Sequence, residues 1–299
     1  MINFIKYSKI YFSIAIICCL ASIFSLTYFG LNLGMDFKGG SAIKIEYESE
    51  APSIEAIKQQ LTLESYEIQS FGDKGILLKI KDKDITADVY DGIMTQLQVD
   101  GSVISDSQFE TISPVIGSEL TNKTLIVAIV ALIAMLLYIA FAFKNVTGPI
   151  APFQYGMIST LMLFNDVLLP LGILAYLGKF YGVEFTIPIV TAILAVIGYS
   201  VNNNIVIFDR IRENLHLFPR DNYAETVNKS LNQVIVRCLN TSISTLFVLI
   251  ALYYFFIGEG GIEYFALIAS VGILVGTFSS IFLSSPLLVA WVSRKQKKA

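Results

Sequence analysis

The residues of this sequence that could do chemistry are polar side chains inside long apolar runs. Asp166 lies in the middle of one run, Asn202, Asn203 and Asn204 follow one another near the end of the next, and Arg237 begins another. Such side chains are costly inside a bilayer unless they are paired or reach water, so each is a candidate functional residue. Protonation removes the charge of a lone carboxylate, which is the property that a proton relay uses. The pattern therefore predicts a polar path through a membrane.

Each of these residues also has a structural interpretation, which the sequence leaves open. Arg237 stands at a helix end, where its guanidinium can extend to the membrane interface. Consecutive asparagines can hydrogen-bond neighbouring helices as packing groups, and Asp166 can have an Asn or Ser partner. Asp209 follows the asparagines at a charged helix end that water can solvate.

Several other classes of protein are excluded. The chain has one histidine and three cysteines, and none of them has metal-ligand spacing. The net charge of −3 argues against a nucleic-acid partner. No nucleophile and base, carboxylate pair or phosphate-binding glycine loop indicates catalysis. We expect no catalytic residues, no metal, no cofactor and no enzymatic activity.

The composition predicts a polytopic α-helical membrane protein, because 55% of the 299 residues are hydrophobic and only 15% are charged. Charge-free runs long enough to cross a bilayer appear six times. The segments that we expect are a tail (1–9), spans at 10–29, 123–143, 152–177, 187–208, 237–257 and 265–292, a glycine-rich segment (30–40), a folded domain (41–122), a loop (209–236) and a tail (293–299). The last span is long enough to tilt or to break near Gly272, Gly276 or Pro286.

The distribution of Lys and Arg sets the expected orientation. Most of these residues lie in the two tails, near Lys144 and in the loop with Arg210, Arg212 and Arg220, whereas the short loops on the other side carry Lys179 alone. The positive-inside rule then places both termini in the cytoplasm and the folded domain outside.

The folded domain alternates strand and helix patterns. We expect strands at 41–47, 65–71, 75–80 and 102–112, and helices at 52–61 and 87–97. One small α+β domain between the first and second spans follows. The glycine-rich segment before it permits tight backbone and indicates a hinge, formed by Gly34, Asp36, Phe37, Gly39 and Gly40.

At these motifs the sequence resembles the SecDF protein-export family of the resistance-nodulation-division superfamily, in its F-subunit half. The resemblance covers nearly the whole chain and is carried by residues 34–40, 198–214, 230–242 and 276–280. It implies a subunit in the bacterial cytoplasmic membrane that assists late steps of protein export. It also implies use of the proton-motive force, a D subunit and the SecYEG channel as partners, and contact with the translocating preprotein. Six spans and one domain would be one half of a twelve-helix arrangement.

One departure from the family pattern concerns the proton path. The family usually has an aspartate at the position of Asn203 and a histidine at that of Asn165, and Asn does not ionise. Three accounts remain open: the relay depends on a carboxylate of the partner, Asp166 or Asp209 takes part, or the protein is not proton-coupled.

The leading hypothesis is therefore an auxiliary translocase subunit without covalent chemistry. The alternative is a stand-alone exporter of small molecules or lipids from the same superfamily, which would need an apolar ligand pocket in the folded domain and self-association. A membrane-anchored receptor or scaffold would need neither internal polar residues nor six spans.

Overall fold

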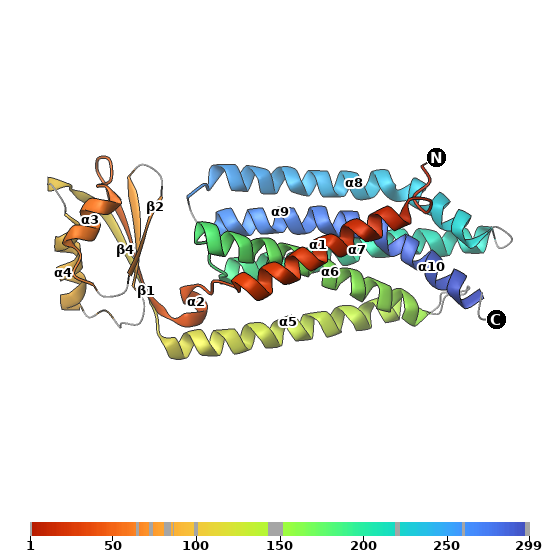
Figure 1. The fold of residues 1–299 in the computed structure, drawn as a ribbon, viewed down its shortest axis with the longest axis horizontal. Helices are drawn as coiled ribbons and strands as arrows, with labels where there is room; N and C mark the ends of the chain where they lie inside the picture. Colours follow the sequence, from red (N-terminus) through yellow and green to blue (C-terminus); the bar gives the residue numbers. More distant parts are fainter. Residues whose placement is uncertain are drawn as a thin grey trace. The chain divides into compact units, whose positions relative to one another are not determined.

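A computed structural model of the chain describes residues 2–63, 66–71, 74–80, 85, 87–98, 101–142, 152–218, 222–258 and 261–296. The basic residues Lys144 and Arg220, which support the predicted orientation, lie outside the described residues, and so do Lys297 and Lys298. The chain forms two compact units (Figure 1). The first comprises Met1–Asn32, Val127–Phe255 and Tyr264–Ala299, and the second comprises Leu33–Ile126 and Phe256–Glu263.

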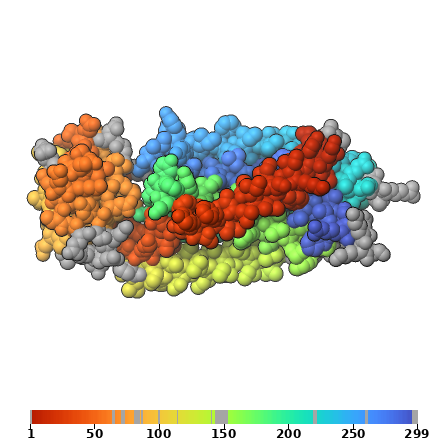
Figure 2. Space-filling view, viewed as in Figure 1, coloured from red at the N-terminus to blue at the C-terminus, as the bar shows by residue number. Residues whose placement is uncertain are grey.

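The first unit is a helical bundle. Its helices are α1 (Ser8–Phe29), most of α5 (Pro114–Ala142), α6 (Pro152–Tyr181), α7 (Ile187–Leu217), α8 (Tyr223–Phe255) and α9 (Gly261–Ser279), followed by the π-helical turn η2 (Ser280–Ser284) and α10 (Ser285–Gln296). Within the described residues, six helical stretches are long and apolar enough to cross a membrane. Helix α1 packs on α6, and Figure 2 shows it (red) lying across one face of the bundle. The predicted polytopic helical fold is confirmed.

The helices extend beyond the charge-free runs. Helix α7 continues to Leu217 and α8 begins at Tyr223, so most of the charged stretch expected as a loop is helical. Charged side chains on a solvated helix face do not interrupt the backbone hydrogen bonds, so charge marks where a helix leaves the membrane and not where it ends. Helix α5 likewise begins at Pro114, a residue type favoured in the first helical turn.

The last span is interrupted next to its proline. Helix α9 gives way to η2 after Ser279, and α10 starts at Ser285, one residue before Pro286. Proline has no backbone N–H and its ring crowds the preceding turn, so the α-helical hydrogen-bond pattern changes just before it. Gly272 and Gly276 lie inside α9 without breaking it.

The second unit contains the predicted α+β domain. Its elements are β1 (Gly40–Tyr47), α3 (Ile54–Gln60), β2 (Tyr66–Phe71), β3 (Gly75–Ile80), α4 (Ala87–Leu97) and β4 (Ile104–Ile112). The strands pair antiparallel in the order β2-β3-β1-β4. This βαββαβ arrangement covers one face of the sheet with both helices (Figure 1).

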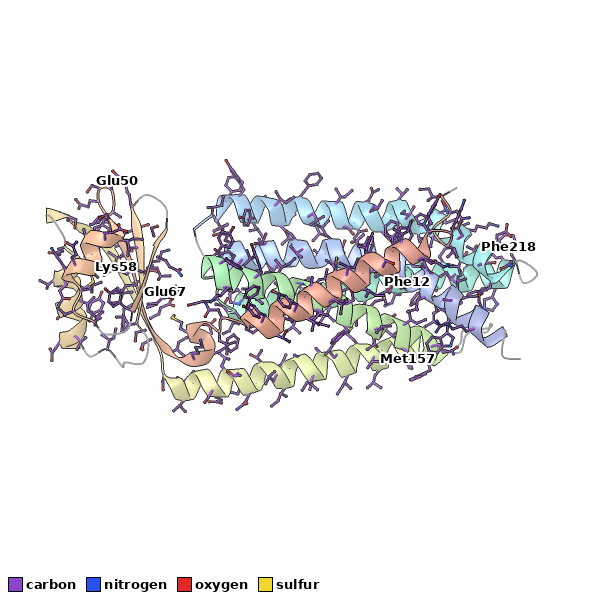
Figure 3. All side chains as sticks on the ribbon, in the orientation of Figure 1. Phe12, Glu50, Lys58, Glu67, Met157 and Phe218 are labelled. Atoms are coloured by element: carbon purple, nitrogen blue, oxygen red, sulfur yellow. The ribbon has the colours of Figure 1, made fainter. Side chains whose placement is uncertain are left out.

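The core of this domain lies between the sheet and the two helices. Alternate residues of β1, namely Ile43, Ile45 and Tyr47, face the core with Ile57 of α3 and Ile93 of α4, and all five are at most 2% exposed. Two-residue periodicity in a strand places such side chains on one face. These inward-facing residues lie within the strand expected at 41–47. Of the charged residues of the domain that Figure 3 labels, Glu50 and Lys58 are exposed and Glu67 is partly exposed.

Tyr47 supplies a polar contact inside this core, and its removal is our first prediction. Its hydroxyl donates to the carbonyl oxygen of Leu97 at 2.9 Å, and burial raises the pKa of the phenol from 10.0 to about 12. We expect Tyr47→Phe to lower the local unfolding free energy by about 1 kcal/mol. Hydrogen exchange of peptides from α4, measured on the full chain, checks this, with Tyr66→Phe on β2 as the control.

The same group makes the domain sensitive to alkaline pH. Because the folded-state pKa is raised, the contribution of Tyr47 is complete below pH 10.0, the ordinary phenol pKa, and is lost as the pH rises through about 12. Tyr47→Phe removes this loss. Equal alkaline sensitivity in wild type and variant would contradict the assignment.

Candidate functional site

Asp166 lies at the centre of the bundle, within α6, and is fully buried. The Ser200 hydroxyl of α7 donates to its Oδ2 atom, and the Asn165 side-chain amide donates to Oδ1 at 3.1 Å. The Cys19 thiol of α1 donates to Asn165 Oδ1 at 3.0 Å. The ion pairs among the described residues join other groups, so Asp166 is held by hydroxyl and amide donors rather than by a cation.

Glycines let α9 approach this site closely. A Cβ atom added at Gly276 would lie 3.2 Å from Ser200 Cβ and 3.6 Å from Asp166 Oδ2. One turn earlier, a Cβ at Gly272 would overlap the Val196 side chain. Small residues spaced four apart are typical of close helix crossings in membranes. Helices α6, α7 and α9 therefore meet at the Asp166 carboxylate.

Our second prediction tests the close crossing of α7 and α9. We expect Gly272→Ala to lower the free energy of unfolding by about 1–3 kcal/mol, because Val196 on a packed helix must move. Thermal unfolding of the purified full chain in detergent measures the change. Gly198→Ala is the matched control, since a Cβ there meets only Met135 Cε at an ordinary 3.8 Å. An equal loss in both variants would refute the tight α7–α9 contact.

The three consecutive asparagines of α7 do not act as one group. Asn203 and Asn204 are 2% and 0% exposed, whereas Asn202 is exposed on another face of the helix. Among the described residues, Asn203 Nδ2 and both side-chain polar atoms of Asn204 have no hydrogen-bond partner. Helical residues are about 100° apart around the axis, so three in a row must diverge.

Arg237 lies on the exposed side of α8. Asn240, Thr241 and Ser244, at helical spacings of three, four and seven residues from it, are exposed as well. We call these four residues the Arg237 stripe. The orientation of α8 is fixed by its buried Ser242, which hydrogen-bonds to Tyr199 of α7 at 3.0 Å and to Thr277 of α9 at 2.7 Å. Arg237 and Asp166 thus belong to different parts of the bundle, one at its surface and one at its centre.

Asp209 is exposed on α7, about two turns before the helix ends at Leu217, and its carboxylate forms an ion pair with Arg212 at 2.6 Å. Nearby, Asn214 Nδ2 donates to Ser230 Oγ at 2.7 Å and to Gln233 Oε1 at 2.8 Å, which ties α7 to α8. Lys229 places its ammonium 3.6 Å from the ring centre of Phe218, which is labelled in Figure 3. These contacts make the hairpin of α7 and α8 a rigid extension of the bundle.

The N-terminal tail is bound to this hairpin by two asparagines that the sequence analysis missed. Asn232 accepts from the Ile2 backbone N–H at 2.9 Å and donates to the Ile2 carbonyl at 2.8 Å. Asn228 accepts from the Phe4 N–H at 2.9 Å, and the Phe4 ring is 1% exposed in the bundle core. The four-residue spacing of these asparagines in the sequence is the signal that could have indicated a paired role.

The glycine-rich segment is ordered backbone. Gly34 precedes the one-turn helix α2 (Met35–Lys38), which contains Asp36 and Phe37, Gly39 ends it, and Gly40 starts β1. Gly39 has a φ of 76°, a conformation that side chains other than glycine rarely adopt. Phe37 is buried, and a Cβ at Gly117 of α5 would lie 2.9 Å from the Phe37 carbonyl. The boundary between the two compact units falls at Asn32 and Leu33, inside this segment.

No group of three or more His, Cys, Asp or Glu side chains is placed to hold a metal ion, as far as the described residues extend. The cysteines Cys18, Cys19 and Cys238 are free. The polar chemistry of the bundle is therefore that of Asp166, its hydroxyl and amide donors, the buried asparagines and the Arg237 stripe.

Comparison with known proteins gives consistent matches along the chain. The family model "Protein export membrane protein SecD/SecF, C-terminal" matches residues 93–294, and the "SecD/SecF GG Motif" matches residues 24–51. The protein translocase subunit SecF of Thermobaculum terrenum is 34% identical over 98% of this chain and 95% of its own length. The SecF of Pseudomonas aeruginosa is 31% identical over 98% of this chain and 92% of its own length.

Solved structures give the same result. The crystal structure of SecDF, a translocon-associated membrane protein from Thermus thermophilus, matches 97% of this chain with a TM-score of 0.80 and 30% identity. A SecDF structure in a super-membrane-facing form matches 99% of it with a TM-score of 0.71 and 30% identity. The chain spans 38% and 39% of those two chains.

Proposed function

Because this chain belongs to the SecD/SecF family of protein-export membrane proteins, we propose that it uses the proton-motive force to assist late steps of preprotein export. Its relatives are named protein translocase subunits, and its role is that of an auxiliary export subunit rather than an enzyme. It is a multi-pass membrane protein with SecD as a partner, since SecD and SecF are combined in one protein in relatives such as the SecDF of Thermus thermophilus.

The observation that carries this proposal is the exposed Arg237 stripe. The Thr241 and Ser244 hydroxyls donate to the backbone carbonyls of Arg237 and Asn240 on the same helix. The Arg237 guanidinium and the Asn240 amide on the surface of a membrane helix are costly against lipid, so these two groups require a protein partner or water. The D subunit covers this stripe in the proposed complex and supplies a carboxylate to Arg237. Such a pair would replace the contact that an aspartate at position 203 provides in other members of the family. The two similar halves then complete one bundle.

Protons move through the polar groups of both halves in this proposal. Asp166 is the buried titratable group of this chain, Asn202 lies on the exposed surface with the Arg237 stripe, and Asn203 and Asn204 lie beside the path as neutral hydrogen-bonding groups. Asp209 marks the charged end of α7. One proton crossing 100 mV releases about 2.3 kcal/mol. That energy shifts a two-state equilibrium more than tenfold when the states differ in proton affinity.

Proton movement is coupled to a swing of the α+β domain about the glycine-rich segment. The placement of the boundary between the two compact units at Asn32 and Leu33 supports a hinge there, as does the glycine-only backbone of Gly39. In the cell, the termini face the cytoplasm and the α+β domain faces outward, where it holds a polypeptide emerging from SecYEG. This orientation rests on the distribution of Lys and Arg.

Preprotein release from vesicles tests the proposal. Inside-out vesicles contain SecYEG and the D subunit, with or without this chain, and a late translocation intermediate is followed with and without a protonophore. We expect the chain to accelerate release and the protonophore to remove that acceleration. Equal release with and without the chain would contradict an export role, and acceleration that survives the protonophore would contradict proton coupling.

A stand-alone exporter is not favoured. The relatives with full-length similarity are named as translocase subunits, and the core of the α+β domain is filled by its own side chains.

A further inference from the structure

Four buried side chains near Asp166 present polar atoms that have no hydrogen-bond partner within the described part of the chain. The atoms are Ser159 Oγ on α6, Asn203 Nδ2 and both polar atoms of Asn204 on α7, and Ser280 Oγ at the start of η2. These four residues are at most 2% exposed. We call them the buried polar layer.

The register of α7 and α9 brings part of this layer together. Gly272 is in contact range of Val196, and Gly276 is in contact range of Ser200, so the two helices run parallel with a constant offset. One further turn along both helices places Ser280 level with Asn204. The π-helical turn that begins at Ser280 packs against α7 and α6.

The register of α6 and α7 adds Ser159 to the same level. The Ser200 hydroxyl binds Asp166, and further along the antiparallel pair the Tyr155 and Phe208 rings have centroids 5.2 Å apart. Between these two contacts, Ser159 lies opposite the turn that contains Asn204. The buried polar layer is thus one to two helical turns, roughly 5–10 Å, from Asp166.

Unpaired polar atoms in a dry interior are destabilising. Each buried amide or hydroxyl without a partner costs about 1–3 kcal/mol. Several such groups within one layer therefore indicate that a small molecule or ion is bound there. The side-chain amides of Asn203 and Asn204 need an acceptor for their N–H groups, whereas the hydroxyls both donate and accept. Water supplies donors and acceptors together. A cation would take only the oxygens and leave the amide N–H groups unpaired.

The layer lies on one side of Asp166. Ser159 precedes Asp166 along α6, which places the layer toward the end of the bundle where α1 begins and α10 ends (Figure 1). Apolar side chains such as Phe208 and Ile211 also lie beyond the layer. On the other side of Asp166 the buried residues are mostly apolar, although Ser22 and Ser25 of α1 are among them. The apolar ones include Leu174, Ile189, Ala192, Ala269 and Ile273.

We propose that the buried polar layer is a water site, and that its water gives Asp166 a proton-exchange route toward the end of the bundle where α1 begins. The inference deepens the proposed proton path and rests on it for its role in export. The case for water itself stands on the unpaired Ser159, Asn203, Asn204 and Ser280 atoms alone.

Silver-ion accessibility of introduced cysteines tests the site. Ser159→Cys and Ser280→Cys are nearly isosteric changes, made in full chains whose native cysteines are replaced by serine or alanine and which are assembled with the D subunit in vesicles. Ala192→Cys and Ala269→Cys, buried in the apolar cluster, are the matched controls. Blocking by Ag⁺ is read as loss of later maleimide labelling in denaturant. We expect the two layer cysteines to be blocked roughly tenfold faster than the controls, a difference of about 1.4 kcal/mol.

The same vesicles test from which side Ag⁺ reaches the layer and whether the layer binds water or a cation. Blocking should be faster when Ag⁺ is added on the side of the termini. Equal blocking rates for the layer and control cysteines would overturn the water site. Faster blocking from the opposite side would overturn the proposed direction of the route. Protection by excess Na⁺ would show that the layer binds a cation rather than water. These readouts do not depend on export. If the chain shows no gradient-dependent export, the proposed function is contradicted, whereas the water site is still decided by the Ag⁺ blocking rates.

Radiolytic footprinting of the wild-type complex covers the case in which a cysteine variant does not assemble. X-rays split bound water into radicals that oxidise adjacent side chains. Met162 is 5% exposed and lies on α6 between Ser159 and Asp166. We expect it to be oxidised in the folded complex at a rate typical of hydrated residues. A Met162 that stays unoxidised until the protein unfolds would overturn the water site.

Discussion

Arg237→Ala is expected to lower the stimulation of preprotein release by this chain at least tenfold, with the complex still present in the membrane. Arg237 is exposed on α8, so its truncation leaves the buried side chains of the bundle in place. In the proposed complex, its removal leaves a carboxylate of the D subunit without a counter-charge. Truncating one partner of a buried charge pair costs about 2–5 kcal/mol, and a tenfold effect corresponds to about 1.4 kcal/mol.

The controls for Arg237→Ala separate charge, geometry and fold. Arg237→Lys keeps the charge and loses the bidentate geometry, so we expect partial activity. Arg212→Ala removes a surface ion pair with Asp209 on α7 and should change release little, because such pairs contribute about 0–1 kcal/mol. Thermal stability of the purified chain should be unchanged by Arg237→Ala. Wild-type release by a correctly assembled Arg237→Ala complex would exclude the role proposed for this residue.

The difference between Asn202 and its two neighbours shows what the sequence pattern cannot resolve. Long charge-free runs located all six membrane helices, because hydrocarbon thickness sets their minimum length. The same runs are apolar on every side, so they carry no amphipathic signal that assigns a face. Asn202, Asn203 and Asn204 therefore form one cluster in the sequence, whereas the fold exposes the first and buries the other two.

The α+β domain was predictable in more detail because one face of its sheet is buried and the other is not. Ile43, Ile45 and Tyr47 alternate with polar residues, and this two-residue period fixed both the strand and its inward face. The binding of the N-terminal tail by Asn228 and Asn232 left only the weaker signal of their four-residue spacing. That spacing indicates a shared helix face, but it does not identify the backbone of Ile2 and Phe4 as the partner.

The second large effect is expected from Asp166→Asn. Asn has the size of Asp and its carbonyl oxygen can accept from the Ser200 hydroxyl, so the contact between α6 and α7 is kept, while the acceptor for the Asn165 amide is lost. The variant cannot bind and release a proton. We expect release by the wild-type complex to slow several-fold when a protonophore collapses the gradient, and release by Asp166→Asn to be slow in both conditions. A several-fold change lies within the roughly 2.3 kcal/mol that one proton supplies across 100 mV, an energy that corresponds to about fiftyfold.

Asn203→Asp is the informative companion to Asp166→Asn, since it restores a carboxylate where the family usually has one. Asn203 is buried and its Nδ2 has no protein partner within the described chain, so the change removes no hydrogen bond of that atom. If Asp166 carries the coupling, wild type responds to the protonophore and Asn203→Asp adds to a response already present. If wild type ignores the gradient and Asn203→Asp responds, then position 203 is the missing relay and Asp166 is a structural residue. Continued protonophore sensitivity in Asp166→Asn would instead place the whole proton route on the D subunit and Arg237.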